Sequence, residues 1–187
     1  MIPKPLSQFS QDQINAAIGR VPALVEQAIR RLKESPFDPA SMYVGHSGGK
    51  DSVLVTYLAD QAFGEEELPT IHNTKPDGVE NAVHPLTQKF LYGMARTITY
   101  MPLGASLPPE LTTQIDGTRI SEWNREDGRS VDVIKNGQSV SRKELELYMQ
   151  NGLFGRNFVY PIYDWSDVEV WAAIYSLNIP YSPEYEQ

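Results

Sequence analysis

From residue 42 onward, the sequence alternates short apolar runs with longer segments of helical periodicity. The short apolar runs, which we expect to form strands, lie at residues 42–44, 69–73, 97–101, 111–115 and 158–162. Strands that alternate with helices across short connections form a mostly parallel sheet covered by helices. The sequence therefore predicts an α/β fold with about five strands, in which a ligand binds at the carboxyl ends of the strands.

A helical segment at residues 1–40 precedes the first strand. Ser10 and Gln13 fit a capping box, in which each side chain satisfies a free backbone N–H at the helix start. We expect a second helix to begin near Pro22, because a proline at the first helical position loses no hydrogen bond. Residues 41–187 form the α/β part of what we expect to be a single domain.

Helices and a hairpin are expected between and after the strands. One helix covers residues 79–95, and Ser141 and Ser166, each followed three residues later by a glutamate, predict two more helix starts. An Asn-Gly pair at residues 136–137 tolerates the positive φ of a tight turn. Residues 131–140 are therefore expected to form a small hairpin insertion.

Composition and charge narrow the class of protein. The net charge is −8 and the pI is about 4.9, so the surface repels phosphate backbones and disfavours nonspecific nucleic-acid binding. The sequence contains no cysteine, which excludes disulfides and thiolate chemistry from its own residues. No apolar run of about 18 residues and no apolar signal core are present, so we expect a soluble cytoplasmic protein.

A glycine-rich turn between the first strand and the next helix carries the strongest functional signal. We call it the glycine loop (residues 45–52), with the sequence Gly45-His46-Ser47-Gly48-Gly49-Lys50-Asp51-Ser52. Glycines let a backbone approach an anion closely, and loop N–H groups at a helix N-terminus favour negative charge. Ser47 and Ser52 add hydroxyl donors, and Lys50 adds a compact positive charge. The loop therefore predicts a phosphate site.

The glycine loop differs from a Walker A loop at two positions. The Walker A pattern requires a glycine where Val44 stands, and a serine or threonine where Asp51 stands. A bare carboxylate would repel phosphate. Two interpretations of Asp51 therefore stay open, a magnesium partner and a structural acceptor within the loop.

Residues 47–52 resemble the PP-loop of the ATP-pyrophosphatase superfamily, which includes the phosphoadenosine phosphosulfate (PAPS) reductases and the small subunits of ATP sulfurylase. Residues 160–171, which contain Asp164 and Trp165, are similar to an Asp-Trp stretch of the same branch, and residues 178–181 resemble the Asn-Ile-Pro that follows it. The resemblance implies the Rossmann-like fold of the adenine nucleotide alpha hydrolases. It also implies that the loop grips the phosphates of ATP or of a sulfonucleotide.

The resemblance extends to residues outside the loop. Gly117 and Arg119, with Arg125 beyond them, are similar to a family pattern whose arginine lies near the nucleotide, and a guanidinium suits phosphate oxygens. The alternative is a solvated charged loop. Many relatives carry an acidic residue at the end of the second strand, where this sequence has Asn73 instead. We expect Asn73 to contact the base or the ribose of the nucleotide. The expected nucleotide-binding residues are Ser47, Gly48, Gly49, Lys50, Asp51, Ser52, Asn73, Gly117, Arg119 and Arg125.

The histidines do not suggest a metal site. His46, His72 and His84 are not at a spacing typical of metal ligands. We expect His46 to be a loop residue and His72 to be a packed or hydrogen-bonded strand residue.

The activity implied by the resemblance is cleavage of ATP between its α and β phosphates, with transfer of AMP to an acceptor oxygen. We expect ATP and Mg²⁺ as cofactors and Lys50, Asp51 and Arg119 as catalytic residues. Lys50 would stabilise the pyrophosphate charge, Asp51 would bind the metal, and Arg119 would contact the α phosphate or the acceptor. The acceptor stays open among sulfate, a nucleic-acid base, a carboxylate and a small metabolite.

Two alternatives follow from the missing cysteine. PAPS reductases use a cysteine near the C-terminus as the nucleophile, so self-contained reduction is not expected of this sequence. The chain is then either a binding module for ATP or a sulfonucleotide, or a partner-dependent subunit in sulfur transfer or reduction. The resemblance is also compatible with a homodimer.

Overall fold

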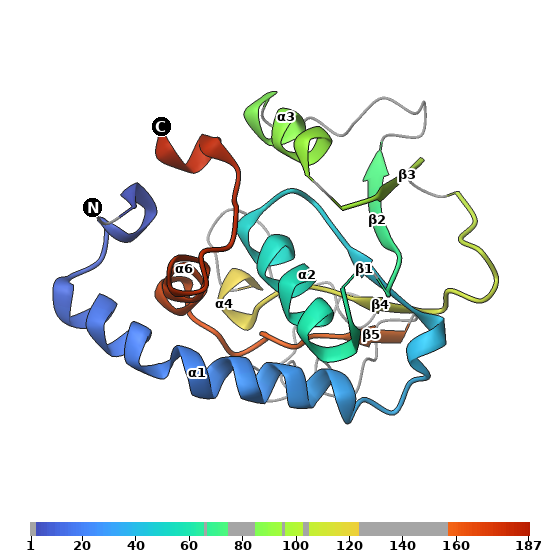
Figure 1. Cartoon of the computed structure of the whole chain (residues 1–187), viewed down its shortest axis with the longest axis horizontal. Helices are drawn as coiled ribbons and strands as arrows, with labels where there is room; N and C mark the ends of the chain where they lie inside the picture. The colour runs from blue at the N-terminus through green and yellow to red at the C-terminus, as the bar shows by residue number, and fades with distance from the viewer. Residues whose placement is uncertain (1–2, 66, 75–84, 95, 103–104, 124–156) are drawn as a thin grey trace.

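The computed structural model describes residues 3–65, 67–74, 85–94, 96–102, 105–123 and 157–187 (Figure 1). The described strands form one five-stranded sheet in the order β3-β2-β1-β4-β5, and every neighbouring pair is parallel. Their bounds are Met42–Gly45 for β1, Thr70–Thr74 for β2, Ile98–Pro102 for β3, Thr113–Ile115 for β4 and Asn157–Val159 for β5. The predicted α/β class with a mostly parallel sheet is confirmed.

The strand order reverses at β1, and this reversal positions the candidate site. The chain proceeds from β1 outward to β2 and β3, then returns to the other side of β1 for β4 and β5. Val44 of β1 pairs with Thr70 of β2 on one side and with Ile115 of β4 on the other. The loops that follow β1 and β4 therefore leave the same edge of the sheet, at the switch point where ligands bind in open α/β folds.

The five predicted strands are present, but the last two are shorter than expected. We predicted residues 111–115 for the fourth strand, whereas β4 begins at Thr113. We predicted residues 158–162, whereas β5 ends at Val159. Pro161 has no N–H to donate to a neighbouring strand, so the ladder ends before it. The apolar residues beyond β5 are buried in a turn instead, where the N–H of Trp165 donates to the carbonyl of Ile162.

The N-terminal segment forms one long helix, where we expected a second helix to begin near Pro22. α1 (Gln11–Lys33) runs without a break through Pro22. The capping box of Ser10 and Gln13 at its start is confirmed. An interior proline costs a helix about 3 kcal/mol, but the buried face of α1 continues on both sides of Pro22. This buried face consists of Ile14, Ala17, Val21, Leu24, Ala28 and Leu32.

Three helices pack against one another to form much of the core. α1 contacts α2 (Lys50–Phe63) and α6 (Asp167–Ser176), and α2 contacts α6 (Figure 1). α6 begins with the predicted capping box of Ser166 and Glu169. The largest apolar side chains with less than 2% exposure are Leu6, Leu32, Met42, Leu54, Leu58, Ile115, Ile162, Trp165 and Ile174. The division of the chain near residue 40 stays a prediction.

Shorter elements complete the described structure. They are the helices α3 (Pro85–Gly93) and α4 (Ile120–Trp123) and the 3₁₀ helices η1 (Lys4–Leu6), η2 (Pro39–Ser41) and η4 (Pro183–Glu186). α3 lies within the predicted helix at 79–95, of which residues 79–84 lie outside the described part. The predicted hairpin at 131–140 and the helix from Ser141 also lie outside it. Among the described residues, none of the helices combines the length and the apolar composition that a membrane span requires.

Candidate functional site

The glycine loop leaves the carboxyl end of β1, and α2 begins within it at Lys50. Gly48 has a φ of +84°, and a Cβ at this residue would lie 2.5 Å from the methyl carbon of Thr87 in α3. Only glycine combines this backbone conformation with such a close approach. A glycine is therefore required at residue 48 by the shape of the turn and by its packing against α3.

Hydrogen bonds within the glycine loop hold its shape. The N–H of Ser47 donates to the Ser52 hydroxyl at 3.2 Å, and the N–H of Gly49 donates to the Ser47 hydroxyl at 3.3 Å. The Ser52 hydroxyl in turn donates to the Gly49 carbonyl at 2.8 Å. The two serines that we predicted as phosphate donors thus stabilise the loop in this structure, and their contact with a nucleotide stays a prediction.

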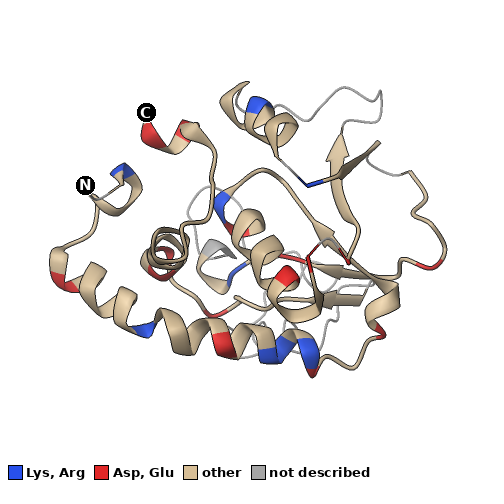
Figure 2. Ribbon diagram, in the orientation of Figure 1, with Lys and Arg blue, Asp and Glu red and all other residues tan. Residues whose placement is uncertain are grey.

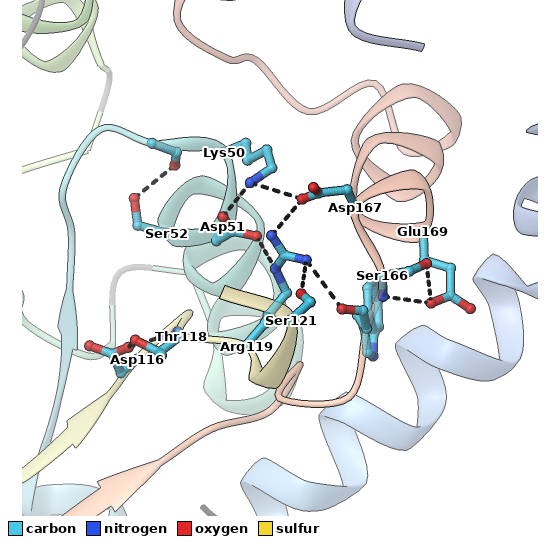
Figure 3. A network of polar contacts seen from close by, with 12 residues as sticks. Lys50, Asp51, Ser52, Asp116, Thr118, Arg119, Ser121, Ser166, Asp167 and Glu169 are labelled. Atoms are coloured by element: carbon cyan, nitrogen blue, oxygen red, sulfur yellow. Dashed lines mark hydrogen bonds and ion pairs between the residues drawn. The ribbon is translucent and has the colours of Figure 1, made fainter. Parts of the chain in front are cut away.

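An ion cluster lies beside the start of α2 (Figure 3). Lys50 Nζ lies 2.7 Å from Asp51 Oδ2 and 3.4 Å from Asp167 Oδ1. Arg119 Nε donates to Asp51 Oδ1 at 2.7 Å, and Arg119 Nη2 donates to Asp167 Oδ1 at 2.6 Å. Two cations therefore share two carboxylates, and the adjoining positive and negative residues are visible at the start of α2 (Figure 2).

Arg119 is the buried centre of the ion cluster. Its side chain is 0% exposed, and Nη1 donates to the Ser121 hydroxyl at 3.0 Å and to the Trp165 carbonyl at 3.2 Å. It joins the loop after β4 to the starts of α2 and α6. The sequence predicted a guanidinium at this edge of the sheet, and the structure places it among protein acceptors beneath Lys50.

Asp167, the first residue of α6, was not predicted as a site residue. Burial by itself would raise the pKa of its carboxyl, but the charges of Arg119 and Lys50 outweigh burial and lower that pKa. Asp167 lies within the Asp-Trp stretch (residues 160–171) that resembles the family, but we had singled out Asp164 in that stretch instead. Asp164 instead forms a bidentate pair with Arg31 of α1, at 2.7 and 2.8 Å.

The two interpretations of Asp51 can be compared in this geometry. Its two carboxylate oxygens accept from Lys50 and Arg119, as expected of a structural acceptor. Within the described ranges, no group of three or more histidine and acidic side chains is arranged to hold a metal ion. Because Mg²⁺ is usually held by one or two carboxylates together with the phosphate oxygens of a nucleotide, the magnesium role of Asp51 stays a prediction.

Gly117 and Asn73 approach the same edge of the sheet from opposite sides of β1. A Cβ on Gly117 would lie 2.9 Å from the carbonyl carbon of Asp51, so a glycine is needed for the loop after β4 to reach the start of α2. Asn73 is an exposed residue of β2 near its carboxyl end. Their contact with a nucleotide stays a prediction. Arg125 lies outside the described residues.

The buried side chain of His46 stabilises the turn of the glycine loop. Its Nδ1 accepts the N–H of Gly48 at 3.1 Å, so Nε2 carries the proton of the neutral ring. Burial, with smaller contributions from His72 and Arg96, lowers the pKa of His46 to about 4. His72 Nδ1 lies 2.7 Å from the His46 carbonyl, and a carbonyl can only accept, so His72 is the donor. Sequence reasoning placed His46 in the loop but missed this supporting role.

Comparison with solved structures identifies the fold. FMN adenylyltransferase from Candida glabrata matches with a TM-score of 0.58 and 11% identity, over 93% of this chain and 65% of that chain. Yeast FAD synthetase in complex with FAD matches with a TM-score of 0.58 and 12% identity, over 99% and 72%. PAPS reductase from Candida auris, in a phosphate complex, matches with a TM-score of 0.50 and 12% identity, over 94% and 91%.

The chain has the Rossmann-like α/β fold of these solved structures. The predicted adenine nucleotide alpha-hydrolase-like architecture is thus confirmed, and at identities of 11–12% the likeness establishes the fold alone. The chain spans about two thirds of the length of the adenylyltransferase that it matches. No protein-family model and no curated sequence matches the chain. The assignment of an activity therefore depends on the geometry of the site.

Proposed function

We propose that the glycine loop binds the phosphates of ATP and that the chain transfers AMP to an acceptor, with release of pyrophosphate. The observation that carries this proposal is the position of Lys50, whose ammonium lies beside the loop at the N-terminus of α2 and is held by Asp51 and Asp167. A helix N-terminus and an ammonium group both favour an anion at this point. Their location at the switch point of the sheet supports the same ligand.

The ion cluster can release Lys50 to a phosphate without leaving a carboxylate unpaired. The Lys50 side chain is 12% exposed, whereas that of Arg119 is 0% exposed. If Lys50 turns toward a phosphate, Arg119 still donates to both Asp51 and Asp167. We therefore propose that Lys50 contacts the nucleotide and that Arg119 positions the two carboxylates behind it.

The reaction in this proposal is an in-line displacement at the α phosphorus. An acceptor oxygen forms a bond to the α phosphorus, and the bond from that phosphorus to the bridging oxygen breaks, so that the electron pair leaves with pyrophosphate. The protein need not form a covalent intermediate, because it can accelerate the reaction by positioning the two reactants and by stabilising the charge that develops in the transition state. Lys50, through its ammonium group and its backbone N–H at the start of α2, would stabilise the charge that develops on pyrophosphate.

The first acceptor to test is FMN, because the matched structures include an FMN adenylyltransferase and an FAD synthetase. The protein is incubated with magnesium, α-labelled ATP and FMN, and the products are separated and counted. We expect labelled FAD with equimolar pyrophosphate. Sulfate and small carboxylates are tested in parallel, with labelled AMP adducts as the readout. Formation of ADP without AMP, adduct or pyrophosphate would rule out cleavage between the α and β phosphates.

A second candidate function is nucleotide binding without turnover, as a module or as a subunit that needs a partner. The absence of cysteine from these 187 residues favours it, because reduction of a sulfonucleotide requires a thiolate. Calorimetry with ATP, AMP, PAPS and the bisphosphate product of PAPS distinguishes the two functions. Tight binding of a sulfonucleotide together with no product from ATP would support the second candidate over adenylyl transfer.

A further inference from the structure

The N–H of Lys50, the first residue of α2, has an acceptor from a distant part of the chain. It donates to the hydroxyl of Tyr185 in η4 at 3.3 Å, across 135 residues. The N–H groups of the three preceding residues donate to side chains within residues 46–52. The N–H groups at the start of a helix are those that bind an anion. Tyr185 therefore occupies a position that a phosphate oxygen would take.

We propose that the Tyr185 hydroxyl competes with the nucleotide for this N–H, and that residues 182–186, which we call the η4 segment, set the affinity of the site for polyphosphate. This inference rests on the proposed nucleotide site. The bound nucleotide displaces the Tyr185 hydroxyl from Lys50, because one N–H cannot donate fully to both acceptors. A phosphate oxygen is the stronger acceptor, since hydrogen bonds to a charged group are about twice as strong as neutral ones.

Tyr185 is the acceptor that can yield without disruption of the loop. Ser52 and His46, which accept from Ser47 and Gly48, belong to the glycine loop, and Ser52 also donates to the Gly49 carbonyl at 2.8 Å. Loss of these bonds would change the turn itself. By contrast, the acceptor of the Lys50 N–H lies on a separate element, so the loss of this bond leaves the hydrogen bonds within the glycine loop in place.

Glu184, the neighbour of Tyr185 in η4, adds a negative charge that would repel a bound polyphosphate. Its carboxylate accepts from the Thr87 hydroxyl, and the Thr87 methyl group lies against Gly48. Thr87 Oγ1 also lies 2.9 Å from the Ser182 hydroxyl, in a buried contact. Acidic residues of η4 are visible at this end of the molecule (Figure 2). The docked η4 segment therefore brings a carboxylate close to the loop and opposes the approach of a polyanion.

Packing holds the η4 segment in its docked position. The Tyr185 ring lies edge-on to the Trp171 ring of α6, with 4.9 Å between centroids. At the other end of the segment, the backbone N–H of Lys4 donates to Glu186 at 3.4 Å, so η1 and η4 lie side by side (Figure 1). Displacement of Tyr185 by a nucleotide is thus expected to change the surroundings of Trp171.

Two conservative variants test the competition. Tyr185→Phe keeps the ring on Trp171 and removes the hydroxyl, and Glu184→Gln keeps the shape and removes the charge. With inorganic pyrophosphate as the probe, calorimetry should give a dissociation constant about 3- to 10-fold lower for Tyr185→Phe, the size expected for one lost competing hydrogen bond. Glu184→Gln should also bind more tightly, and its gain should shrink as salt screens the charge.

Matched controls and the wild type separate this inference from the proposed function. Tyr175→Phe changes a 44% exposed tyrosine of α6, and Glu34→Gln changes an exposed acid beyond α1, so both should bind as the wild type does. If the wild type binds pyrophosphate and Tyr185→Phe binds it equally or more weakly, the competition is overturned and the nucleotide site stands. If neither protein binds pyrophosphate or ATP, the proposed function falls, and this inference falls with it.

Fluorine NMR gives a second measurement that does not depend on affinity. The chain has three tryptophans, so 5-fluorotryptophan labelling gives three signals that single Trp→Phe variants assign. Saturating pyrophosphate should shift the signal of Trp171, because Tyr185 leaves its edge. A Trp171 signal that stays unmoved at saturation would show that the η4 segment remains docked, and this would also overturn the competition.

Discussion

Lys50 is the residue whose charge bears most directly on the proposed phosphate site. Its replacement by alanine should raise the dissociation constants of ATP and pyrophosphate about 10- to 100-fold, the range for loss of a charge-assisted hydrogen bond. Asp51 keeps its bond from Arg119, so the fold should persist. Calorimetry measures the affinities, with Lys33→Ala at the exposed end of α1 as the control. Equal affinities for the two variants would contradict a phosphate contact by Lys50.

His46 makes stability depend on pH. The folded protein keeps His46 neutral down to about pH 4, whereas an unperturbed histidine takes up a proton near 6.5. The unfolded chain then binds more protons in this window, so the free energy of unfolding should fall by about 3 kcal/mol as the pH drops from 6.5 to 4. His46→Asn keeps an acceptor for the Gly48 N–H but does not titrate.

Urea unfolding at pH 7, 5.5 and 4.5 tests this expectation. The wild type should lose stability more steeply than His46→Asn over that range. The other histidines are the same in both proteins, so their contribution cancels in the comparison. If the free energy of unfolding depends on pH in the same way in both proteins, protonation of His46 is not linked to unfolding.

At the scale of single residues, sequence patterns located the loop and the arginine but not all of their neighbours. Lys50 and Asp51 belong to a contiguous motif, and Arg119 follows the loop's neighbouring strand, so parallel topology alone brings these residues together. Asp167 joins them only because α6 begins next to α2, and Tyr185 only because η4 lies over the loop. Such contacts depend on helix packing and loop paths, which a single sequence does not encode in any local pattern.

At the scale of elements, α1 shows how tertiary packing overrides a local signal. Pro22 lies in the helix interior and is exposed, so its missing N–H and its ring oppose the helix without a gain from burial. Pro22→Ala should therefore raise the free energy of unfolding by about 1–2 kcal/mol, after allowance for the greater entropy of the unfolded variant. Chemical denaturation measures this change.

Gly19→Ala provides a comparison within the same helix. A Cβ at Gly19 meets nothing within 4 Å, so this change should add about 0.5–1 kcal/mol through helix propensity alone. Pro22→Ala should exceed it, because it also restores a backbone hydrogen bond. If Pro22→Ala destabilises the protein, the proline contributes a contact or a kink that the packing of α1 requires.

The five strands were located because each contains a short apolar run, although β4 and β5 are shorter than the runs that predicted them. The errors lie where chemistry other than periodicity decides the outcome. Pro161 ends β5 early, and the continuous buried face of α1 outweighs the helix-start signal at Pro22. The sheet order β3-β2-β1-β4-β5 is also absent from the local patterns, since it depends on which side of β1 the chain takes on its return.

At the scale of the whole molecule, the ion cluster connects three parts of the fold. Arg119 follows β4, Asp51 lies in the first turn of α2, and Asp167 begins α6. Removal of a buried cation leaves its carboxylate partners with too little compensation, which costs about 3–5 kcal/mol. Arg119→Met preserves much of the side-chain volume, so chemical denaturation should show a loss of about that size. Arg30→Met, in the exposed pair with Glu26, should change stability by less than about 0.5 kcal/mol.

Measurements at two pH values show whether Arg119→Met loses stability through the missing charge or through the changed side-chain volume. The charges of Arg119 and Lys50 hold the pKa of Asp167 below its usual value of 3.8, so the stabilisation is present above that value and is lost as the pH falls through the lowered pKa. The difference in unfolding free energy between the wild type and Arg119→Met should therefore narrow when unfolding is measured at about pH 3 instead of pH 7. A difference that stays constant would attribute the loss to packing around the side chain. A difference that narrows would show that the carboxylates, held as anions by Arg119, couple the starts of α2 and α6 across the switch point.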